Sequence, residues 1–376
     1  MTTDTGARPA QGVRPIELLW DLVFVFAVTQ VTAFLEHDHG WAGAARGMLL
    51  LALMWWAWSA FVWVVNAHSD ETQGVRISLM GCIVVCFITA LALPDAFTTH
   101  GVLFAVSYSA VRVVHLALYA DASRRGSADR GAITGMAATT ILGLVLLVAG
   151  GFLSPGPRAA LWTLAALIDY AGPTWFTRHR LRSLQAVAVE HFSERYGLFL
   201  IICLGESLVG VGLGARGHEL TEPRLAAAAA GVAVVIALWF AYFGELAEEA
   251  RSRLARHEEP VLAGADGYSL LHLVIVAGVI LFAVGANHAI QRGSASFGAT
   301  AALFMFGGLA AYHAGLTAFA WRLLGRPPPR MAAMVVLLAV LLPVAAVLPA
   351  WAAALLAAAA CALPMLWVRR VRHVAV

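Results

Sequence analysis

The sequence predicts an all-α, polytopic integral membrane protein: a bundle of about 12 spanning helices with both termini in the cytoplasm. Three observations carry this prediction: the composition, the lengths of the apolar segments and the distribution of arginine. Hydrophobic residues make up 61% of the 376 residues, and charged residues only 12%. Soluble domains are about 25% charged, so a chain this apolar needs lipid rather than water around most of its surface.

The apolar segments are long enough to cross a bilayer as helices. A spanning helix takes about 20 apolar residues, because lipid offers no partner to an unpaired backbone group. The sequence predicts twelve such segments, at 17–35, 44–66, 75–93, 100–120, 132–152, 159–177, 196–213, 225–245, 268–290, 297–321, 331–348 and 350–368. The polar stretch 1–16 lacks a small-residue cleavage site, so we expect the first segment to remain as a helix rather than to be removed as a signal peptide.

The arginines predict the orientation of these segments. The chain has no lysine, so its 25 basic residues are all arginine. With the N-terminus inside, nineteen of them fall in inside segments and five in outside segments, and Arg112 lies within a helix. Basic residues stay on the cytoplasmic side of membrane proteins. The distribution therefore indicates an even number of spans in a multi-pass protein of the cell inner (plasma) membrane.

Two segments hint at an internal repeat. ELLWDLVFVFAVTQV begins at Glu17 and ERYGLFLIICLGESLVGV begins at Glu194, and each carries a polar pair twelve and thirteen residues later. Six predicted spans separate them, which allows a parallel 6+6 repeat. The chain then divides into a cytoplasmic tail 1–16, a first half 17–177, a cytoplasmic connection 178–195, a second half 196–368 and a cytoplasmic tail 369–376.

Ionisable side chains inside a span are costly and usually mark function. Glu206 is the sharpest case, because it lies about ten residues into the predicted seventh span and so near the bilayer midplane. A carboxyl group at that depth is costly to ionise, which favours proton exchange. The alternative is a structural Glu206 that is paired with an Arg or Tyr of another helix.

Arg112 is the one arginine deep inside a predicted span, and His115 shares its helix face. A guanidinium keeps its proton and must find an acceptor, for which Asp21 and Glu206 are the candidates. Such a pair is either purely architectural or part of an anion-binding site.

Further polar residues complete the set of candidates. Glu17 and Asp21 are carboxylates four residues apart at the start of the first helix, where the helix dipole favours acids. Trp55, Trp56, Trp58 and Trp63 form an aromatic stripe that either lines a cavity or serves packing and interface anchoring. The remaining candidates inside spans are Gln30, Asp169 and His272, and a predicted cytoplasmic polar cluster contains Asp70, Arg76, His191, Glu194 and Arg195.

Several familiar chemistries have no sequence signature here. GxxxxGK[ST], HExxH and GxSxG are all absent from the sequence. His37, Asp38 and His39 lie together in a short external loop, which we interpret as a solvated polar loop rather than a metal site. We therefore expect no metal and no cofactor, and the lack of a basic patch argues against nucleic acid as a partner.

Three segments together resemble the bacterial low temperature requirement A (LtrA) family: RPIELLWDLVFVFAVTQV at 14–31, HFSERYGLFLIICLGESLVGV at 191–211 and YSLLHLVIVAGVILFAVGANHAI at 268–290. One departure is Leu273, where a proline is common in the family. The resemblance implies a multi-pass membrane protein linked to low-temperature or stress tolerance. Carried over by position, it points to Glu17, Asp21, Gln30, Asp70, Arg76, Arg112, His191, Glu194, Arg195, Gly205, Glu206 and His272.

Three functions remain open at this stage. The first is a secondary transporter of an unknown small-molecule substrate, with or without proton coupling, with its site between two halves. The second is a membrane-embedded enzyme that acts on a lipid or hydrophobic metabolite, with the cytoplasmic cluster for general acid–base chemistry. The third is a stress sensor or scaffold without turnover. We favour the transporter over the enzyme and the scaffold.

Overall fold

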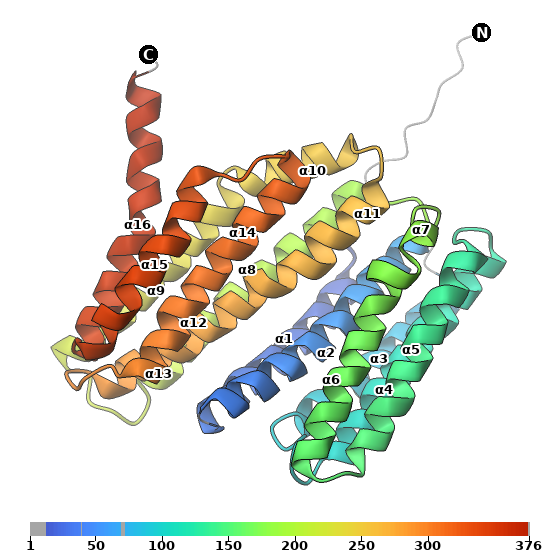
Figure 1. Cartoon of the computed structure of the whole chain (residues 1–376), viewed down its shortest axis with the longest axis horizontal. Helices are drawn as coiled ribbons and strands as arrows, with labels where there is room; N and C mark the ends of the chain where they lie inside the picture. The colour runs from blue at the N-terminus through green and yellow to red at the C-terminus, as the bar shows by residue number, and fades with distance from the viewer. Residues whose placement is uncertain (1–12, 39, 69–71, 375–376) are drawn as a thin grey trace.

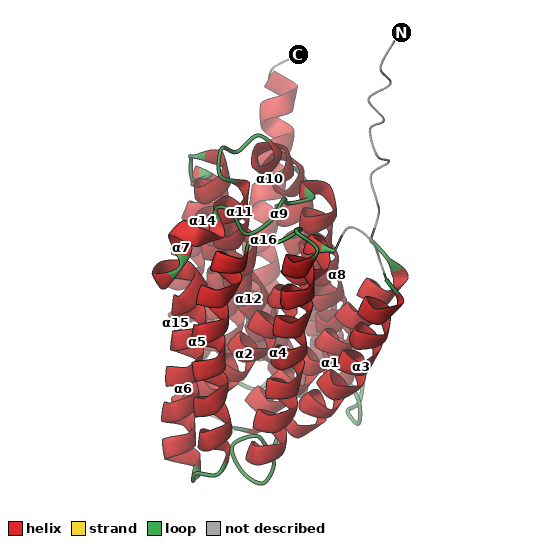
Figure 2. Cartoon of the chain, turned by 90° about the vertical axis from the view of Figure 1, so that its right-hand side faces the viewer, coloured by secondary structure: helices red, strands yellow, loops and turns green. Residues whose placement is uncertain are grey.

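The computed structural model describes residues 13–374 apart from 39 and 69–71, and this part of the chain is a bundle of helices (Figures 1 and 2). Ten helical segments in it are long and apolar enough to cross a membrane, which confirms the predicted polytopic helical bundle. They are α1 (Pro15–His37), α2 (Trp41–Ala67), α3 (Gln73–Ala92), α4 (Gly101–Arg124), α5 (Arg130–Gly151), α8 (Val189–Gly214), α9 with α10 (Glu222–Ala255), Pro260–Arg292, Ala299–Leu324 and α15 (Pro329–Val347).

The two other predicted spans are also helical. α6 (Pro155–Ala171) has 17 residues and continues into a π-helical turn, η1 (Gly172–Phe176). Pro173 lies in this turn, and a proline cannot donate the backbone hydrogen bond that a regular α-helix needs. α16 (Ala350–Val374) follows α15 after a break of two residues, and its stretch Ala350–Pro364 is a shorter apolar helix. All twelve predicted segments are thus helices, and ten of them are candidate spans by length and composition in the part of the chain that the structure describes.

Several elements differ from the predicted spans. α8 begins at Val189, seven residues before the predicted 196. Two predicted spans are built from several pieces: α11 (Pro260–Gly264), η2 (Ala265–Leu271) and α12 (His272–Arg292) form one, and α13 (Ala299–Ala302), η3 (Leu303–Gly307) and α14 (Gly308–Leu324) form the other. Two short helices at one end of the bundle, α7 (Arg178–Leu181) and α10 (Leu246–Ala255), were not expected. α9 (Glu222–Phe243) ends at Phe243, and Gly244 lies between α9 and α10.

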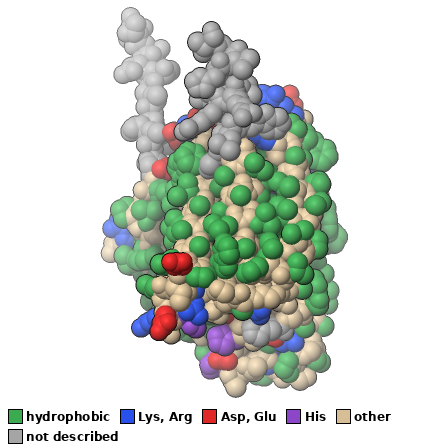
Figure 3. All heavy atoms as spheres, turned by 90° about the vertical axis from the view of Figure 1, so that its left-hand side faces the viewer, with side chains coloured by type: hydrophobic (Ala, Val, Ile, Leu, Met, Phe, Trp, Pro, Cys, Tyr) green, Lys and Arg blue, Asp and Glu red, His purple; other side chains and the backbone are tan. Residues whose placement is uncertain are grey.

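The face of the bundle in Figure 3 is apolar in its middle, and charged side chains gather towards its two ends. Large apolar side chains such as Val84, Val145 and Val340 are at least 60% exposed. Exposed apolar side chains of this kind suit the hydrocarbon core of a bilayer. We call the end that carries α7, α10 and α11 the arginine-rich end, and the other the opposite end (Figure 1).

The helices up to α7 lie on one side of the molecule and those from α8 on the other (Figure 1). α1 and α2 form the contact, packing against α8 and α12. α1 and α8 both begin at the arginine-rich end, where Glu17 and His191 meet, and α16 ends there as well (Figure 1). This parallel placement of α1 and α8 is what a 6+6 repeat requires.

Glycines bring α12 and α14 into close contact. A Cβ atom on Gly278 would lie 2.5 Å from the backbone nitrogen of Tyr312, and one on Gly308 would lie 2.6 Å from that of Phe282. Small residues permit such an approach between membrane helices, where van der Waals packing drives association. The pair α12–α14 is therefore a rigid support for the polar residues of η2.

Candidate functional site

A cavity lies where the two groups of helices meet, towards the arginine-rich end. The centre of a water molecule can occupy a volume of about 60 Å³ inside this cavity. A cavity that holds a single water needs roughly 10–15 Å³ of such volume. Its walls come from α2, α4, α5, α6, η1 and α7 on one side and from α11 and η2 on the other. The polar and charged lining residues are Ser59, Arg112, His115, Tyr119, Asp169, Thr174, Arg178, Asp266 and Ser269.

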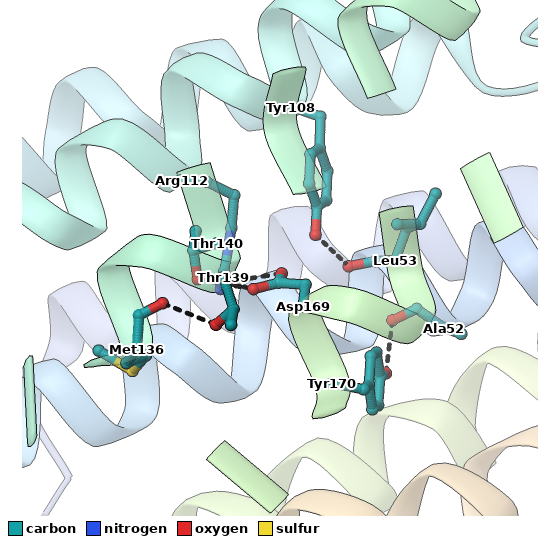
Figure 4. A network of polar contacts seen from close by, with 9 residues as sticks. All are labelled: Ala52, Leu53, Tyr108, Arg112, Met136, Thr139, Thr140, Asp169 and Tyr170. Carbon is teal, nitrogen blue, oxygen red and sulfur yellow. Dashed lines mark hydrogen bonds and ion pairs between the residues drawn. The ribbon is translucent and has the colours of Figure 1, made fainter. Parts of the chain in front are cut away.

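Arg112 and Asp169 form a buried ion pair at this cavity (Figure 4). Nη2 of Arg112 on α4 donates to both carboxylate oxygens of Asp169 on α6, at 2.9 and 3.1 Å. Thr140 on α5 donates to Oδ1 of Asp169 at 2.6 Å and accepts from Arg112 at 3.2 Å. The acceptor is therefore neither Asp21 nor Glu206, and that prediction is wrong. α4 packs against α5, and α5 against α6, so the guanidinium meets the carboxylate of its own group of helices.

The guanidinium of Arg112 is only partly satisfied by this pair. Its Nε and Nη1 atoms are buried and have no hydrogen-bond partner among the described residues. A guanidinium has five N–H donors; Nε carries one and Nη1 two, so three of them lack a protein acceptor. Each buried polar group that stays unpaired costs about 1–3 kcal/mol. Water or a ligand in the cavity is needed to accept these hydrogen bonds.

His115 lies one helical turn after Arg112 and is equally buried, with 1% of its side chain exposed. Neither of its ring nitrogens has a hydrogen-bond partner in the described part of the chain. The ring contacts only aromatic groups, with Phe61 at 5.8 Å and Tyr119 at 5.1 Å between centroids. A neutral imidazole has one donor and one acceptor, so His115, which lines the cavity, has one of each without a partner among the described residues.

Serine and tryptophan side chains form the wall shared by the two groups of helices. The hydroxyl of Ser269 in η2 accepts from Trp63 Nε1 and from Ser59, each at 2.8 Å. The hydroxyl of Tyr196 on α8 lies 2.7 Å from that of Ser59. Trp56, also on the wall, stacks on Tyr170 at 4.0 Å between ring centroids. The predicted tryptophan stripe thus serves both purposes, because two of its members line the cavity and the others pack inside.

Two arginines bind one carboxylate of the cavity lining, towards the arginine-rich end. Arg178 on α7 donates to both oxygens of Asp266 in η2, at 2.7 Å each, and Arg322 on α14 donates to one of them at 2.8 Å. The hydrogen bonds with Asp266 raise the pKa of Arg178, so this guanidinium stays charged. Sequence analysis did not select these three residues. The signal was an aspartate directly before a predicted span, facing basic residues in two other cytoplasmic segments.

A second polar cluster joins the starts of α1 and α8. Arg195 donates to Asp21 from Nη2 at 2.5 Å and from Nε at 3.2 Å, and Nη1 lies 3.4 Å from Glu17. His191 contacts Glu17 at 2.8 Å, and Trp58 Nε1 donates to Asp21 at 2.7 Å. Four of the predicted candidates therefore lie together, although none of them lines the cavity. These ion pairs explain why α8 begins earlier than its apolar segment.

The other members of the predicted cytoplasmic cluster are exposed or lie outside the described residues. Glu194 and Arg76 are exposed, and Asp70 lies outside the described part of the chain.

His272 is buried, and both of its ring nitrogens have hydrogen-bond partners: it contacts the hydroxyl of Tyr242 at 2.8 Å and the carbonyl of Gly267 at 3.0 Å. It does not line the cavity.

Glu206 and Gln30 also lie away from the cavity. Both are half-buried, and Glu206 has no hydrogen bond or ion pair among the described residues. Glu206 is residue 18 of the 26 in α8 because the helix begins at Val189, so it lies beyond the helix midpoint rather than at it. At a rise of about 1.5 Å per residue, this places it roughly 7 Å further towards the opposite end. Gly205 beside it faces open space.

Comparisons with known proteins place this architecture in one family. The sequence model of the bacterial low temperature requirement A protein (LtrA) matches residues 12–366. An uncharacterized protein of Rhizobium meliloti (strain 1021) is 31% identical over 309 residues, which cover 80% of this chain and 75% of that relative. No solved structure matches the chain. The chain belongs to the bacterial low temperature requirement A (LtrA) family.

Proposed function

We propose that this protein is a secondary transporter of the cell inner membrane that carries a small solute through the cavity at Arg112. The observation that supports this function is the position of the cavity. Its walls come from both groups of helices, and it contains buried polar atoms without protein partners. Transporters built from two repeats bind their substrate between the repeats, and rocking of one against the other exposes the site to each side in turn.

Three contacts support such a movement. Towards the arginine-rich end, the two groups of helices meet in the serine and tryptophan wall around Ser269, in the Arg195 cluster and in the bonds of Asp266 with Arg178. All three are polar and hydrogen-bonded. At the opposite end, Asn287 on α12 donates to Glu36 on α1. Polar contacts of this kind can exchange partners as the groups move. We therefore assign the present arrangement to a state in which Asp266 restricts the arginine-rich entrance.

Labelling of a cysteine in the cavity tests alternating access without knowledge of the solute. The four native cysteines are buried, and Ala60 lines the cavity. Ala60→Cys, in oriented membrane vesicles, is treated with a membrane-impermeant maleimide from each side. A transporter gives labelling from both sides, whereas labelling from the arginine-rich side alone would contradict the proposal.

Two exposed positions provide matched controls for sidedness. Ser183 follows α7 at the arginine-rich end, and Ser154 precedes α6 at the opposite end. Ser183→Cys should react only from the first side and Ser154→Cys only from the second. These two variants also report the orientation of the protein, which the arginine distribution predicts to be with the arginine-rich end in the cytoplasm.

A membrane-embedded enzyme remains the second candidate because of His115. Its two unpartnered ring nitrogens in the cavity are suited to general acid–base chemistry. An enzyme needs access from one side only, so one-sided labelling of Ala60→Cys would favour it over the transporter.

A further inference from the structure

We infer that the cavity binds a small monocarboxylate with an apolar body, held by Arg112 and His115. This inference rests on the proposed function for its biological meaning, but its physical basis is independent of movement. Arg112 and His115 are each 1% exposed, both line the cavity, and each has polar atoms that no described residue satisfies.

The sign of the ligand's charge follows from the unsatisfied groups. Nε and Nη1 of Arg112 offer donors and no acceptors. His115 in its neutral form adds one more donor and one acceptor. A carboxylate has two oxygens that accept several hydrogen bonds, and hydrogen bonds between a guanidinium and a carboxylate are among the stronger ones. A cationic ligand would leave the arginine donors unsatisfied.

The magnitude of the charge follows from the ionised groups around the cavity. Arg112 and Arg178 face Asp169 and Asp266, and Arg322 binds Asp266 from outside the lining. The two arginines and two aspartates of the lining balance each other, and Arg322 adds one positive charge beside Asp266. A monoanion neutralises this charge, whereas a dianion would place an uncompensated charge in a buried site. Asp169 does not compete with the ligand for Nε and Nη1, because it is bound to Nη2 of Arg112 and to Thr140.

The remainder of the lining predicts the body of the ligand. Trp56, Trp63, Met136 and Leu270 contribute apolar surface to the cavity. Most ligand sites have this composition, with a few polar groups that orient a largely apolar molecule. An inorganic anion of the same charge would accept hydrogen bonds from the guanidinium but would make no apolar contacts with these side chains.

Binding is tested with the full chain purified in detergent, by the shift of its melting temperature and by calorimetry. The probes are acetate, butyrate and benzoate, each compared with its neutral amide: acetamide, butyramide and benzamide. We expect saturable stabilisation by at least one carboxylate, with at least tenfold weaker binding of the matched amide. Equal binding of acid and amide, or no saturable binding of any of the three acids, would overturn the inference. Chloride or phosphate that binds as tightly as the best carboxylate would overturn the assignment of an apolar body.

Variants connect the binding to the two named residues. His115→Phe leaves the Arg112–Asp169 pair intact and should weaken carboxylate binding at least tenfold. The double variant Arg112→Gln/Asp169→Asn removes both charges together, which avoids an unpaired buried charge, and should abolish binding. Arg158→Gln is the control, because Arg158 is a buried arginine that binds backbone carbonyls at the opposite end. Unchanged affinity in both cavity variants, or an equal loss in Arg158→Gln, would contradict the site.

This experiment separates the ligand from the transport function. Carboxylate binding combined with one-sided labelling of Ala60→Cys would retain the ligand class and reject transport. Two-sided labelling without carboxylate binding would retain transport and reject the ligand class.

Discussion

Arg178 and Asp266 are 88 residues apart in sequence and share two hydrogen bonds of 2.7 Å, which join α7 to η2 beside the cavity. The carboxylate of Asp266 also accepts from Arg322 at 2.8 Å. One aspartate thus ties the end of the first group of helices to two elements of the second. In the proposed transporter, it would restrict access to the cavity from the arginine-rich end.

Asp266→Asn is expected to open this entrance. The neutral amide binds two guanidinium groups more weakly than a carboxylate does, so the two groups of helices separate more often. The rate of maleimide labelling of Ala60→Cys from the arginine-rich side should rise several-fold. Asp121→Asn is the matched control, because Asp121 pairs with Arg125 on the surface and does not line the cavity. An equal rate in both variants would show that Asp266 does not act as a barrier.

The ion pair of Arg112 and Asp169 should contribute strongly to stability. Asp169→Asn leaves a buried guanidinium without its counter-ion, for which we expect a loss of about 3–5 kcal/mol. Arg112→Gln/Asp169→Asn should be less destabilised than the sum of the single variants, because neither charge remains. The denaturation midpoints of the four proteins give the interaction energy. The same cycle on Arg46 and Asp38, which are about one-third exposed, should give only about 0–1 kcal/mol. Similar energies for the two pairs would contradict the prediction.

The extent of sequence-based prediction differs between the fold and the site. Apolar length and arginine placement are local properties of the sequence. They predicted twelve segments, all of which are helical, including α6 and α16, which are not among the ten candidate spans. The partner of Arg112 depends on which helices are neighbours in space. Asp169 was recognised as an unusual mid-span carboxylate, but nothing in the order of the chain indicates that α4 and α6 face the same cavity. The bonds of Asp266 were missed for the same reason.

Two tryptophans on α2 permit a comparison of charged and neutral acceptors. Trp58 Nε1 donates to the carboxylate of Asp21 at 2.7 Å, and Trp55 Nε1 donates to the carbonyl of Ser269 at 2.6 Å. Both side chains are at least 97% buried. Substitution by phenylalanine removes the same atoms at either position, so the difference between the two losses of unfolding free energy reflects the acceptor of the hydrogen bond. A hydrogen bond to a charged group contributes about 1.5–3 kcal/mol and a neutral one about 0.5–1.5 kcal/mol.

Trp58→Phe should therefore lower the free energy of unfolding more than Trp55→Phe, by roughly 1 kcal/mol. Denaturant titration in detergent, followed by the fluorescence of the remaining tryptophans, measures both. A larger loss of stability in Trp55→Phe than in Trp58→Phe would show that the hydrogen bonds from Arg195 are sufficient for Asp21.

The contact between α12 and α14 should depend on the absence of a side chain at Gly278. Gly278→Ala places a methyl group 2.5 Å from the backbone of Tyr312, so the helices must separate. Gly205→Ala is the control: nothing lies within 4 Å of its added carbon, and alanine is favoured over glycine in a helix by about 0.5–1 kcal/mol. We expect a lower melting temperature for Gly278→Ala and an equal or higher one for Gly205→Ala. Equal melting temperatures of Gly278→Ala and the native protein would exclude a tight α12–α14 contact.

Glu206 is the candidate for proton coupling, although it lies apart from the cavity. It is a half-buried carboxyl in α8 without a described ion-pair partner, and such groups inside membranes are costly unless they can be neutralised. Proton uptake there would change the position of α8, which contacts α1, α2 and α12. Glu206→Gln removes this charge, so labelling of Ala60→Cys from the two sides should differ from that in the parent protein, whereas Glu219→Gln, in the exposed loop after α8, should leave the labelling unchanged. Equal labelling in Glu206→Gln and the parent would exclude Glu206 as the coupling group of the proposed transporter.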